Sequence, residues 1–164
     1  EMAPLLREWV DGGWLTLTPG PIIDHDEVQK RIEALCDEHS IEFLVFDQAH
    51  SVQMAASLIK KGHKAGTIRS TPAEVSEPTK DLISRARAGR LRHNGNPVLA
   101  WNAANTCLRP GELWKPEKDK TVPKLKIDGI SAAVHANTAR LGRVSVRMPE
   151  KKKPFDPTKV VRTL

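Results

Sequence analysis

The chain has 164 residues, 28% of them charged and 39% hydrophobic, which is typical of a globular protein rather than a disordered one. This length suits one ordinary domain with a real core. No apolar run approaches the length of a membrane span, so we expect no membrane partner. Two cysteines without CxxC spacing, Cys36 and Cys107, argue against a disulfide framework and against a zinc site.

The charge is distributed unevenly along the chain. Residues 1–58 carry three basic and eleven acidic side chains, a net charge of −8, whereas residues 59–164 carry 23 basic and nine acidic, a net charge of +14. A strongly basic half favours a polyanionic partner, because neutralising phosphates releases counterions. Lysines that only keep the surface soluble are the alternative. The size of the excess favours the phosphate interpretation.

Hydrophobic periodicity predicts alternating helices and strands. The helices are expected over residues 4–10, 24–39, 50–61, 76–89 and 128–141. The strands are expected over residues 14–20, 41–47, 65–70 and 97–101. Strand, helix, strand, helix and strand in short succession imply crossover connections and a largely parallel sheet. Residues 108–121 predict a loop or a two-stranded ribbon, and residues 143–164 predict a basic, partly flexible tail.

Asp47 is the first candidate for chemistry. It ends the most apolar segment of the chain, so its carboxylate should emerge at the carboxyl end of a central strand. In open α/β sheets that edge is where ligands bind. An aspartate at the end of a strand also often caps the following helix. Position alone leaves the two interpretations of Asp47 even.

Asp128 is the second candidate, at the start of a helix whose face carries the small residues Ser131, Ala132 and Ala139. An acid there can simply cap its own helix. Small residues would let the first turn press against a sheet edge. If Asp47 and Asp128 meet there, their carboxylates would repel unless a divalent cation such as Mg²⁺ lay between them. The pair therefore predicts metal-dependent phosphodiester chemistry.

Other polar residues compete with this pair. Asp24 with Glu27 forms a capping-box pattern, which favours a helix start over a metal site. The histidines show no paired ligand spacing. His50 follows Asp47 closely enough to line the same site, whereas His135 is expected to pack. The absence of a GxxxxGK[ST] loop and of a GxSxG elbow counts against an ATPase and an α/β hydrolase.

Six motifs in order resemble the C-terminal nuclease domain of the large terminase subunit of tailed bacteriophages, over about residues 9–141. They are TLTPGPIIDHDEV, FLVFDQAH, LIKKGHKAG, SEPTKDL, LRHNGNPVLAWNAANTCLR and KLKIDGISAAVHA. The most specific are HxGNPVxxW from His93, with Asn105 after it, and KIDG from Lys126 to Gly129. The resemblance implies an RNase H-like fold, a mixed central sheet flanked by helices.

The family cuts concatemeric viral DNA with two divalent metals, Mg²⁺ or Mn²⁺, held by an acidic triad. By resemblance, Asp47 matches the second acid and Asp128 the last, whereas Asp24 matches a helix start. The side chains expected to hold the phosphate backbone are Lys124, Lys126, Arg90 and Arg92. Those expected to line the site are His50, His93 and Asn105.

The family's first acid lies on a strand for which residues 1–23 offer no match. We therefore expect an N-terminally truncated nuclease domain over residues 1–142 and the tail over residues 143–164. The chain would be a fragment of a longer gene product or a degenerate, prophage-derived remnant. Metal binding is then expected to be impaired, and an exposed sheet edge favours a homo-oligomer or a strand swap.

The resemblance implies an endonuclease module of a viral packaging motor in the cytoplasm of the bacterial host. Its implied partners are double-stranded DNA, an upstream ATPase domain of the same protein, the small terminase subunit and the portal. The alternative is a catalytically silent DNA-binding or assembly module that keeps the fold and the basic surface. The missing first acid favours this alternative for the chain itself, and the two remaining acids favour the nuclease for the parent protein.

Overall fold

The computed structural model describes residues 3–108, 111–122 and 124–144. The helices are α1 (Ala3–Asp11), α2 (His25–Glu38), α3 (Gln48–Lys60), α4 (Pro72–Arg87), α5 (Pro97–Ala104) and α6 (Asp128–Arg140). The strands are β1 (Leu44–Asp47), β2 (Ala65–Ile68), β3 (Thr106–Leu108) and β4 (Pro116–Lys118). Within these residues, no helix combines the length and the apolar character needed to cross a membrane. The expected tail lies almost wholly outside the described residues.

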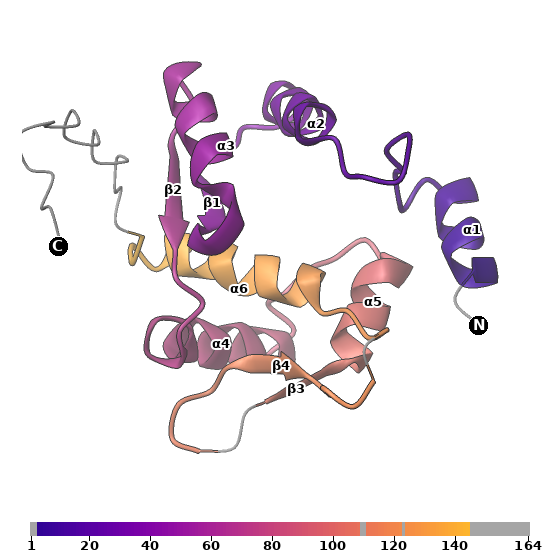
Figure 1. Ribbon diagram of the computed structural model, residues 1–164. Coiled ribbons are helices and arrows are strands. Elements are labelled where there is room, and N and C mark those ends of the chain that lie inside the picture. The colour runs from indigo at the N-terminus through magenta and orange to yellow at the C-terminus, as the bar shows by residue number, and fades with distance from the viewer. Residues whose placement is uncertain (1–2, 109–110, 123, 145–164) are drawn as a thin grey trace, which may run out of the picture.

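The first unit is a parallel strand pair joined by a helix. β1 and β2 run parallel, with Leu44 opposite Ala65 and Asp47 opposite Ile68. Parallel strands need a crossover connection, and α3 supplies it while packing against both strands (Figure 1). The predicted strand, helix and strand over residues 41–70 are confirmed.

The second sheet is the antiparallel ribbon of β3 and β4, in which Thr106 pairs with Lys118. Of the two alternatives predicted for residues 108–121, a loop or a two-stranded ribbon, the ribbon is present, but its first strand begins earlier, at Thr106. The described strands form two separate two-stranded sheets rather than one larger central sheet. The α/β class expected from the sequence is confirmed, and the single mixed sheet is not seen among the described residues.

The core lies where α6 crosses the strands. This helix packs against α4, α5 and β1, and Figure 1 shows it in the middle of the molecule. Ile68, Val75 and Val134 are buried there, with Val45 and Leu82 packed on them. Burying such side chains stabilises the fold by about 1.5–3 kcal/mol each. The contact between α4, α6 and the strand pair therefore holds the middle of α6 in place.

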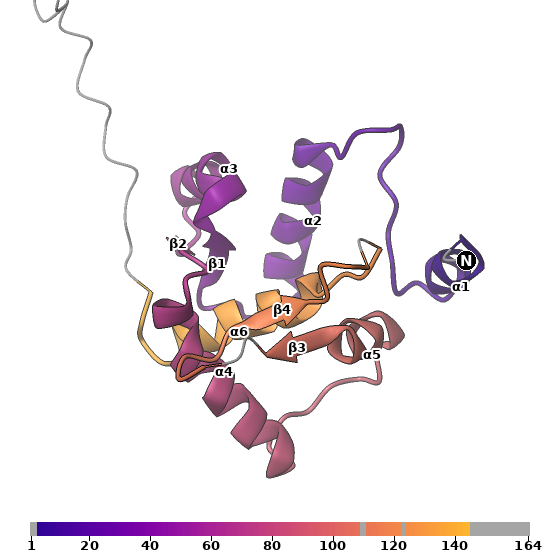
Figure 2. The same cartoon turned by 60° about the horizontal axis from the view of Figure 1, so that its bottom comes forward.

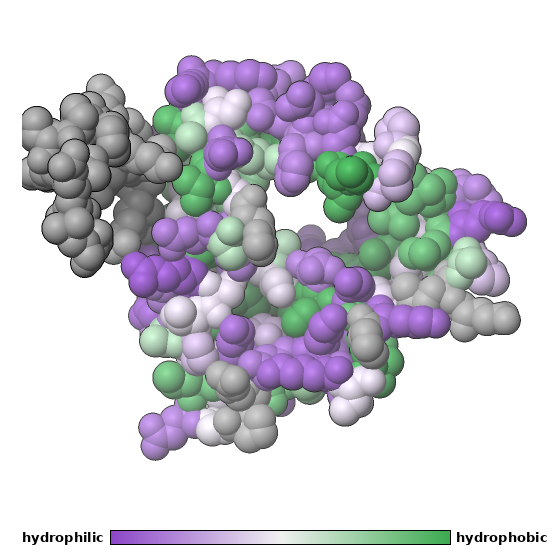
Figure 3. Space-filling model, in the orientation of Figure 1, coloured by the Kyte–Doolittle hydropathy of each residue, from purple (hydrophilic) through white to green (hydrophobic). Residues whose placement is uncertain are grey.

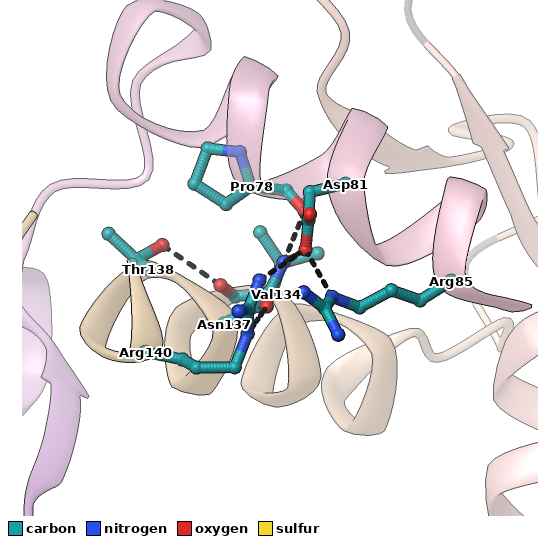
Figure 4. A network of polar contacts seen from close by, with 7 residues as sticks. All are labelled: Pro78, Asp81, Arg85, Val134, Asn137, Thr138 and Arg140. Carbon is teal, nitrogen blue, oxygen red and sulfur yellow. Dashed lines mark hydrogen bonds and ion pairs between the residues drawn. The ribbon is translucent and has the colours of Figure 1, made fainter. Parts of the chain in front are cut away.

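A polar network joins α4 to α6 beside this core (Figure 4). The buried amide of Asn137 donates to the carbonyl of Pro78 at 2.8 Å and to Asp81 at 3.0 Å. Asp81 also accepts from Arg85 and Arg140. Hydrogen bonds from Asn137 and Arg85 hold the pKa of Asp81 below its usual value. The network fixes the two helices against each other.

The predicted strand over residues 97–101 is wrong, because this segment is helix α5. Asn96 is the N-cap, and its side chain accepts from the backbone N–H of Leu99 at 3.1 Å. Pro97 occupies the first helical position, where its missing N–H is harmless. The short apolar run was ambiguous between strand and helix, and the Asn-Pro start decides for the helix.

The predicted strand over residues 14–20 is also wrong. The backbone N–H groups of Trp14 and Leu15 donate to the carbonyl of Trp9, at 2.8 and 3.1 Å. The segment thus folds back on the end of α1 and pairs with no strand in the described part of the chain. Trp9, 4% exposed, meets Trp101 of α5 with ring centroids 5.5 Å apart. Figure 2 shows α1 at the periphery, beyond a long connection to α2.

The predicted start of the fourth helix at residue 76 is one turn late. α4 begins at Pro72 after the N-cap Thr71, and Pro78 lies inside the helix. Proline is favoured in the first turn of a helix, so the sequence offers two plausible starts. The remaining predicted helices are confirmed within a few residues, and Asp24 caps α2 by accepting from the backbone N–H groups of Asp26 and Glu27.

The surface around α2 and the segment before it is exposed rather than packed into the core. In the space-filling view, hydrophilic residues cover α2 and α3 along the top, and an opening separates α2 from the side formed by α5 and α6 (Figure 3). No residue of α2 is buried. Large apolar side chains in the preceding segment are exposed, with Leu17 at 67% and Ile22 at 80%.

Candidate functional site

Asp47 stands at the carboxyl end of β1 and caps α3. One carboxylate oxygen, Oδ1, accepts from the backbone N–H of Ala49 at 2.9 Å. The other, Oδ2, accepts from the hydroxyl of Ser70 at 2.5 Å. The capping interpretation of Asp47 is therefore confirmed, and both of its oxygens are engaged within the fold.

Ser70 connects Asp47 to a buried histidine of α6. The Ser70 hydroxyl lies 2.9 Å from Nε2 of His135. A hydroxyl has one proton, and Ser70 gives it to Asp47, so Nε2 of His135 must carry a proton and donate to Ser70. Burial lowers the pKa of His135, while the charge of Asp47 opposes that shift. We infer a neutral imidazole with its proton on Nε2.

The order of these three groups decides what they can do. A serine is activated as a nucleophile when a base accepts its proton, but here Ser70 donates to the Asp47 carboxylate and accepts from His135. The arrangement is therefore structural support for a carboxylate. It ties the end of β1, the segment after β2 and the middle of α6 together.

Asp128 has a different environment. It is the first residue of α6 and is exposed. Its carboxylate makes no hydrogen bond or ion pair with any residue the structure describes. The simple capping interpretation of Asp128 is therefore not supported. A carboxylate without a protein partner is available to a ligand.

The backbone on both sides of Asp128 is held by α5 and its C-cap. Asn102 accepts from the backbone N–H of Gly129 at 2.9 Å. Asn105 donates to the backbone carbonyl of Lys126 at 3.2 Å. Asn105, expected to line the site, thus acts on the segment that carries the acid.

The close approach of α6 is made to α5 and not, as predicted, to a sheet edge. A Cβ added at Gly129 would lie 3.2 Å from Cδ1 of Leu99 and 3.6 Å from Cγ of Asn102. The helix reaches the end of β1 further along, at His135. The first turn of α6 carries a glycine because a neighbouring helix lies against it.

Asp128 and His135 lie on one face of α6, because seven residues are close to two full turns. The same spacing separates them by about 10 Å along the helix axis. Asp47 is thus connected to the Asp128 face of α6 through Ser70 and His135. Among the described residues, no group of three or more His, Cys, Asp or Glu side chains is placed to hold a metal. A direct meeting of Asp47 and Asp128 stays a prediction.

The other predicted site residues lie in connecting segments. Four cations expected to hold DNA are exposed, two between α4 and α5 and two before α6: Arg90, Arg92, Lys124 and Lys126. His93 accepts through Nδ1 from the backbone N–H of Gly95 at 3.1 Å, so it shapes the turn before α5. His50 belongs to α3, and its side chain lies outside the described part of the structure.

A cavity of about 540 Å³ lies at the opposite end of α6. Its lining comes from the end of β2, the start of α4 and the end of α6, and includes Arg69, Glu74, Thr138 and Arg143. Arg143 pairs with Glu77. Asp128 does not line this cavity, which borders the Asp47 end of the candidate site through Gln48 and Arg69.

Sequence reasoning missed how three residues organise the site, Ser70, Asn102 and His135, although His135 was correctly expected to pack. Each acts through a partner far away in the chain, at separations of 23, 27 and 65 residues. A partial signal existed for Asn102, because it lies in the same motif as Asn105.

The fold and the site together define an α/β domain in which an acid ends a parallel strand and a second acid begins the helix that packs on that strand. Residues 5–142 match the model of the family described as terminase large subunit, endonuclease domain. The chain belongs to this family, as the resemblance predicted.

Two known proteins are similar to this chain. Protein YmfN of Escherichia coli (strain K12) is 27% identical over 138 residues, which is 82% of this chain and 30% of the relative. The crystal structure of the HK97 bacteriophage large terminase matches with a TM-score of 0.70 and 24% identity, over 81% of this chain and 28% of that one. This structural likeness shows the fold. The chain thus spans about three tenths of the length of the proteins it matches.

Proposed function

We propose that this chain is the endonuclease module of a phage-type terminase large subunit, hydrolysing phosphodiester bonds of double-stranded DNA during genome packaging. The proposal is carried by membership of the terminase nuclease family, and it is supported by the positions of Asp47 at the end of β1 and Asp128 at the start of α6, two elements that pack against each other. The basic charge of residues 59–164, a net +14, supports a DNA partner.

The proposed cofactor is Mg²⁺ or Mn²⁺. The available side chains have the right chemical type for such a cation, but their arrangement does not form its site. Carboxylates are the ligands that hard cations prefer. Both oxygens of Asp47, however, are engaged by Ala49 and Ser70, and the described residues bring no third acid to the pair. As arranged here, these residues do not make up a two-metal site, and a further carboxylate and a released Asp47 oxygen would be needed.

The remaining assignments extend the same proposal. Residues 1–142 form the nuclease part, and residues 143–164 a basic extension. Exposed cations on two segments would hold the phosphate backbone: Arg90, Arg92, Lys124 and Lys126. Asp128 would be the acid most open to a cation, and Asp47 the acid built into the fold. The partners proposed for the parent protein are its ATPase domain, the small terminase subunit and the portal, in the cytoplasm of the bacterial host.

The test is plasmid cleavage by the full chain in Mn²⁺ or Mg²⁺, compared with Asp128→Ala. The matched control is Asp26→Ala, because Asp26 is also an exposed aspartate in the first turn of a helix. We expect cleavage that falls at least about a hundredfold in Asp128→Ala and is unchanged in Asp26→Ala. Cleavage that survives the loss of Asp128 would contradict the assignment of Asp128 as a metal-binding catalytic residue.

A catalytically silent DNA-binding or assembly module is the second candidate. The observation that favours it is the full engagement of the Asp47 carboxylate by the fold. In that case the chain binds DNA with an affinity that falls steeply with salt, and neither cation supports cleavage. Binding measured at several salt concentrations beside the cleavage assay separates the two candidates.

A further inference from the structure

The first turn of α6 lacks a cap of its own. The first N–H groups of a helix have no partner within the helix, and an oxygen-bearing residue at the N-cap usually supplies one. Here Ile127 occupies the N-cap, with φ −132° and ψ 17°, and it makes no side-chain cap. The carboxylate of Asp128 makes none either.

Asn102 supplies the missing acceptor from a neighbouring helix. Its side chain is 4% exposed. Oδ1 accepts from the backbone N–H of Gly129 at 2.9 Å, and Nδ2 donates to the carbonyl of Val98 at 2.9 Å. An amide offers an acceptor at one end and donors at the other, so a single orientation satisfies both partners. Asn102 is thus fixed on α5 and holds α6 at the residue after Asp128.

The closeness of the two helices at this point supports the same interpretation. Gly129 leaves no room for a side chain without moving Leu99. Asn105 takes up the carbonyl of Lys126 on the other side of the acid. The peptide backbone is therefore held by α5 both before and after Asp128.

We propose that Asn102 is a positioning residue for Asp128. By capping α6 from another helix, it leaves the Asp128 carboxylate unused by the helix and holds it in place for a hard cation. The role rests on the proposed nuclease function. The side chains of a catalytic site must be held to within about 0.5 Å of their working positions. An uncapped helix start that frays would not achieve this.

The first experiment needs neither metal nor DNA. Amide hydrogen exchange is measured on the full chain with Asn102→Ala, Asn102→Asp and Asn137→Ala. Asn137 is the matched control, a buried asparagine 6% exposed whose hydrogen bonds lie further along α6. We expect about tenfold faster exchange at Gly129 in Asn102→Ala, as the loss of one hydrogen bond implies. Asn102→Asp keeps the acceptor but loses the donor to Val98 and buries a charge, so it is expected to keep only part of the protection.

The second experiment measures cleavage in Mn²⁺ with the same variants. Asn102→Ala is expected to lower kcat about tenfold or more and to leave the KM for DNA unchanged, since Asn102 does not touch the substrate. Asn102→Asp should recover part of the rate, and Asn137→Ala should lower it only by the fraction of protein that is unfolded. Unchanged exchange at Gly129, or equal kinetic losses in Asn102→Ala and Asn137→Ala, overturns the proposal.

The two arms separate this inference from the nuclease assignment. If the wild-type chain does not cleave DNA, the nuclease proposal fails for this chain. Broadening of the amide signals around Asp128 by added Mn²⁺ then decides the role of Asn102. Broadening that Asn102→Ala weakens supports positioning, and broadening that is absent, or equal in both proteins, counts against it.

Discussion

The two acids of the candidate site are held in opposite ways. The side chain of Asp47 accepts from Ala49 and Ser70, so its carboxylate is part of the fold. The side chain of Asp128 has no partner among the described residues, and the backbone beside it is held instead, by Asn102. One acid is fixed through its oxygens, and the other is fixed through the chain that carries it.

The difference separates stability from function at the two positions. A ligand that takes an oxygen of Asp47 must displace a hydrogen bond that stabilises the fold. A ligand that binds Asp128 displaces only water. We therefore expect Asp128 to be the position at which activity is lost without loss of stability, and Asp47 the position at which both change together.

The largest expected effect is on the stability of the Asp47→Ala variant. We expect it to lose about 2 kcal/mol, because the cap of α3 is worth about 1 kcal/mol and Ser70 is left without its acceptor. Asp128→Ala should stay within about 0.5 kcal/mol of the wild type. Urea denaturation in metal-free buffer measures both, and equal losses would contradict the comparison. Asp47→Asn, which keeps an acceptor for Ala49, is the control.

A smaller effect is the coupling between Asp47 and Ser70. Ser70→Ala alone is expected to cost about 1 kcal/mol. The double variant with Asp47→Ala should cost less than the sum of the two, with a coupling free energy on the order of 1 kcal/mol. A double-mutant cycle from denaturation curves gives this value, and strict additivity would show that the bond contributes nothing.

The pH dependence of stability should report on His135. Its pKa in the folded protein is lowered from the usual 6.5 by burial, so the unfolded chain binds the proton more readily. The contribution of His135 is present above pH 6.5 and is lost as the pH falls from there through the folded pKa. The wild type should therefore lose more stability on acidification than His135→Gln. Parallel stability curves for the two proteins would refute this.

The smallest expected effect is that of Gly129→Ala. Alanine favours a helix by up to about 1 kcal/mol over glycine, but its Cβ would lie 3.2 Å from Cδ1 of Leu99. That atom ends a flexible side chain and can move by a few tenths of an ångström. We expect a net change within about 0.5 kcal/mol in thermal or urea unfolding. A loss above 2 kcal/mol would mean that α5 and α6 meet more rigidly than this.

The sequence by itself determined the features that depend on neighbours in the chain. The crossover unit of β1, α3 and β2, the helix start at Asp24 and the placement of Asp47 and Asp128 at element ends follow from local patterns. The Asn-Pro signal for the start of α5 is also local, but the apolar residues that follow it led to the prediction of a strand. Residues 14–20 alternated as a strand does and yet found no partner strand in the described part of the chain.

Only the tertiary structure decided what holds the two acids. Ser70 reaches Asp47 across 23 residues, and Asn102 reaches the start of α6 across 27. No local period encodes such contacts, because they exist only once α5 and α6 pack and β2 lies beside β1. The sequence thus determined that two acids stand at the ends of two elements. Packing decided that one carboxylate is engaged and the other is left free of protein partners within the described residues.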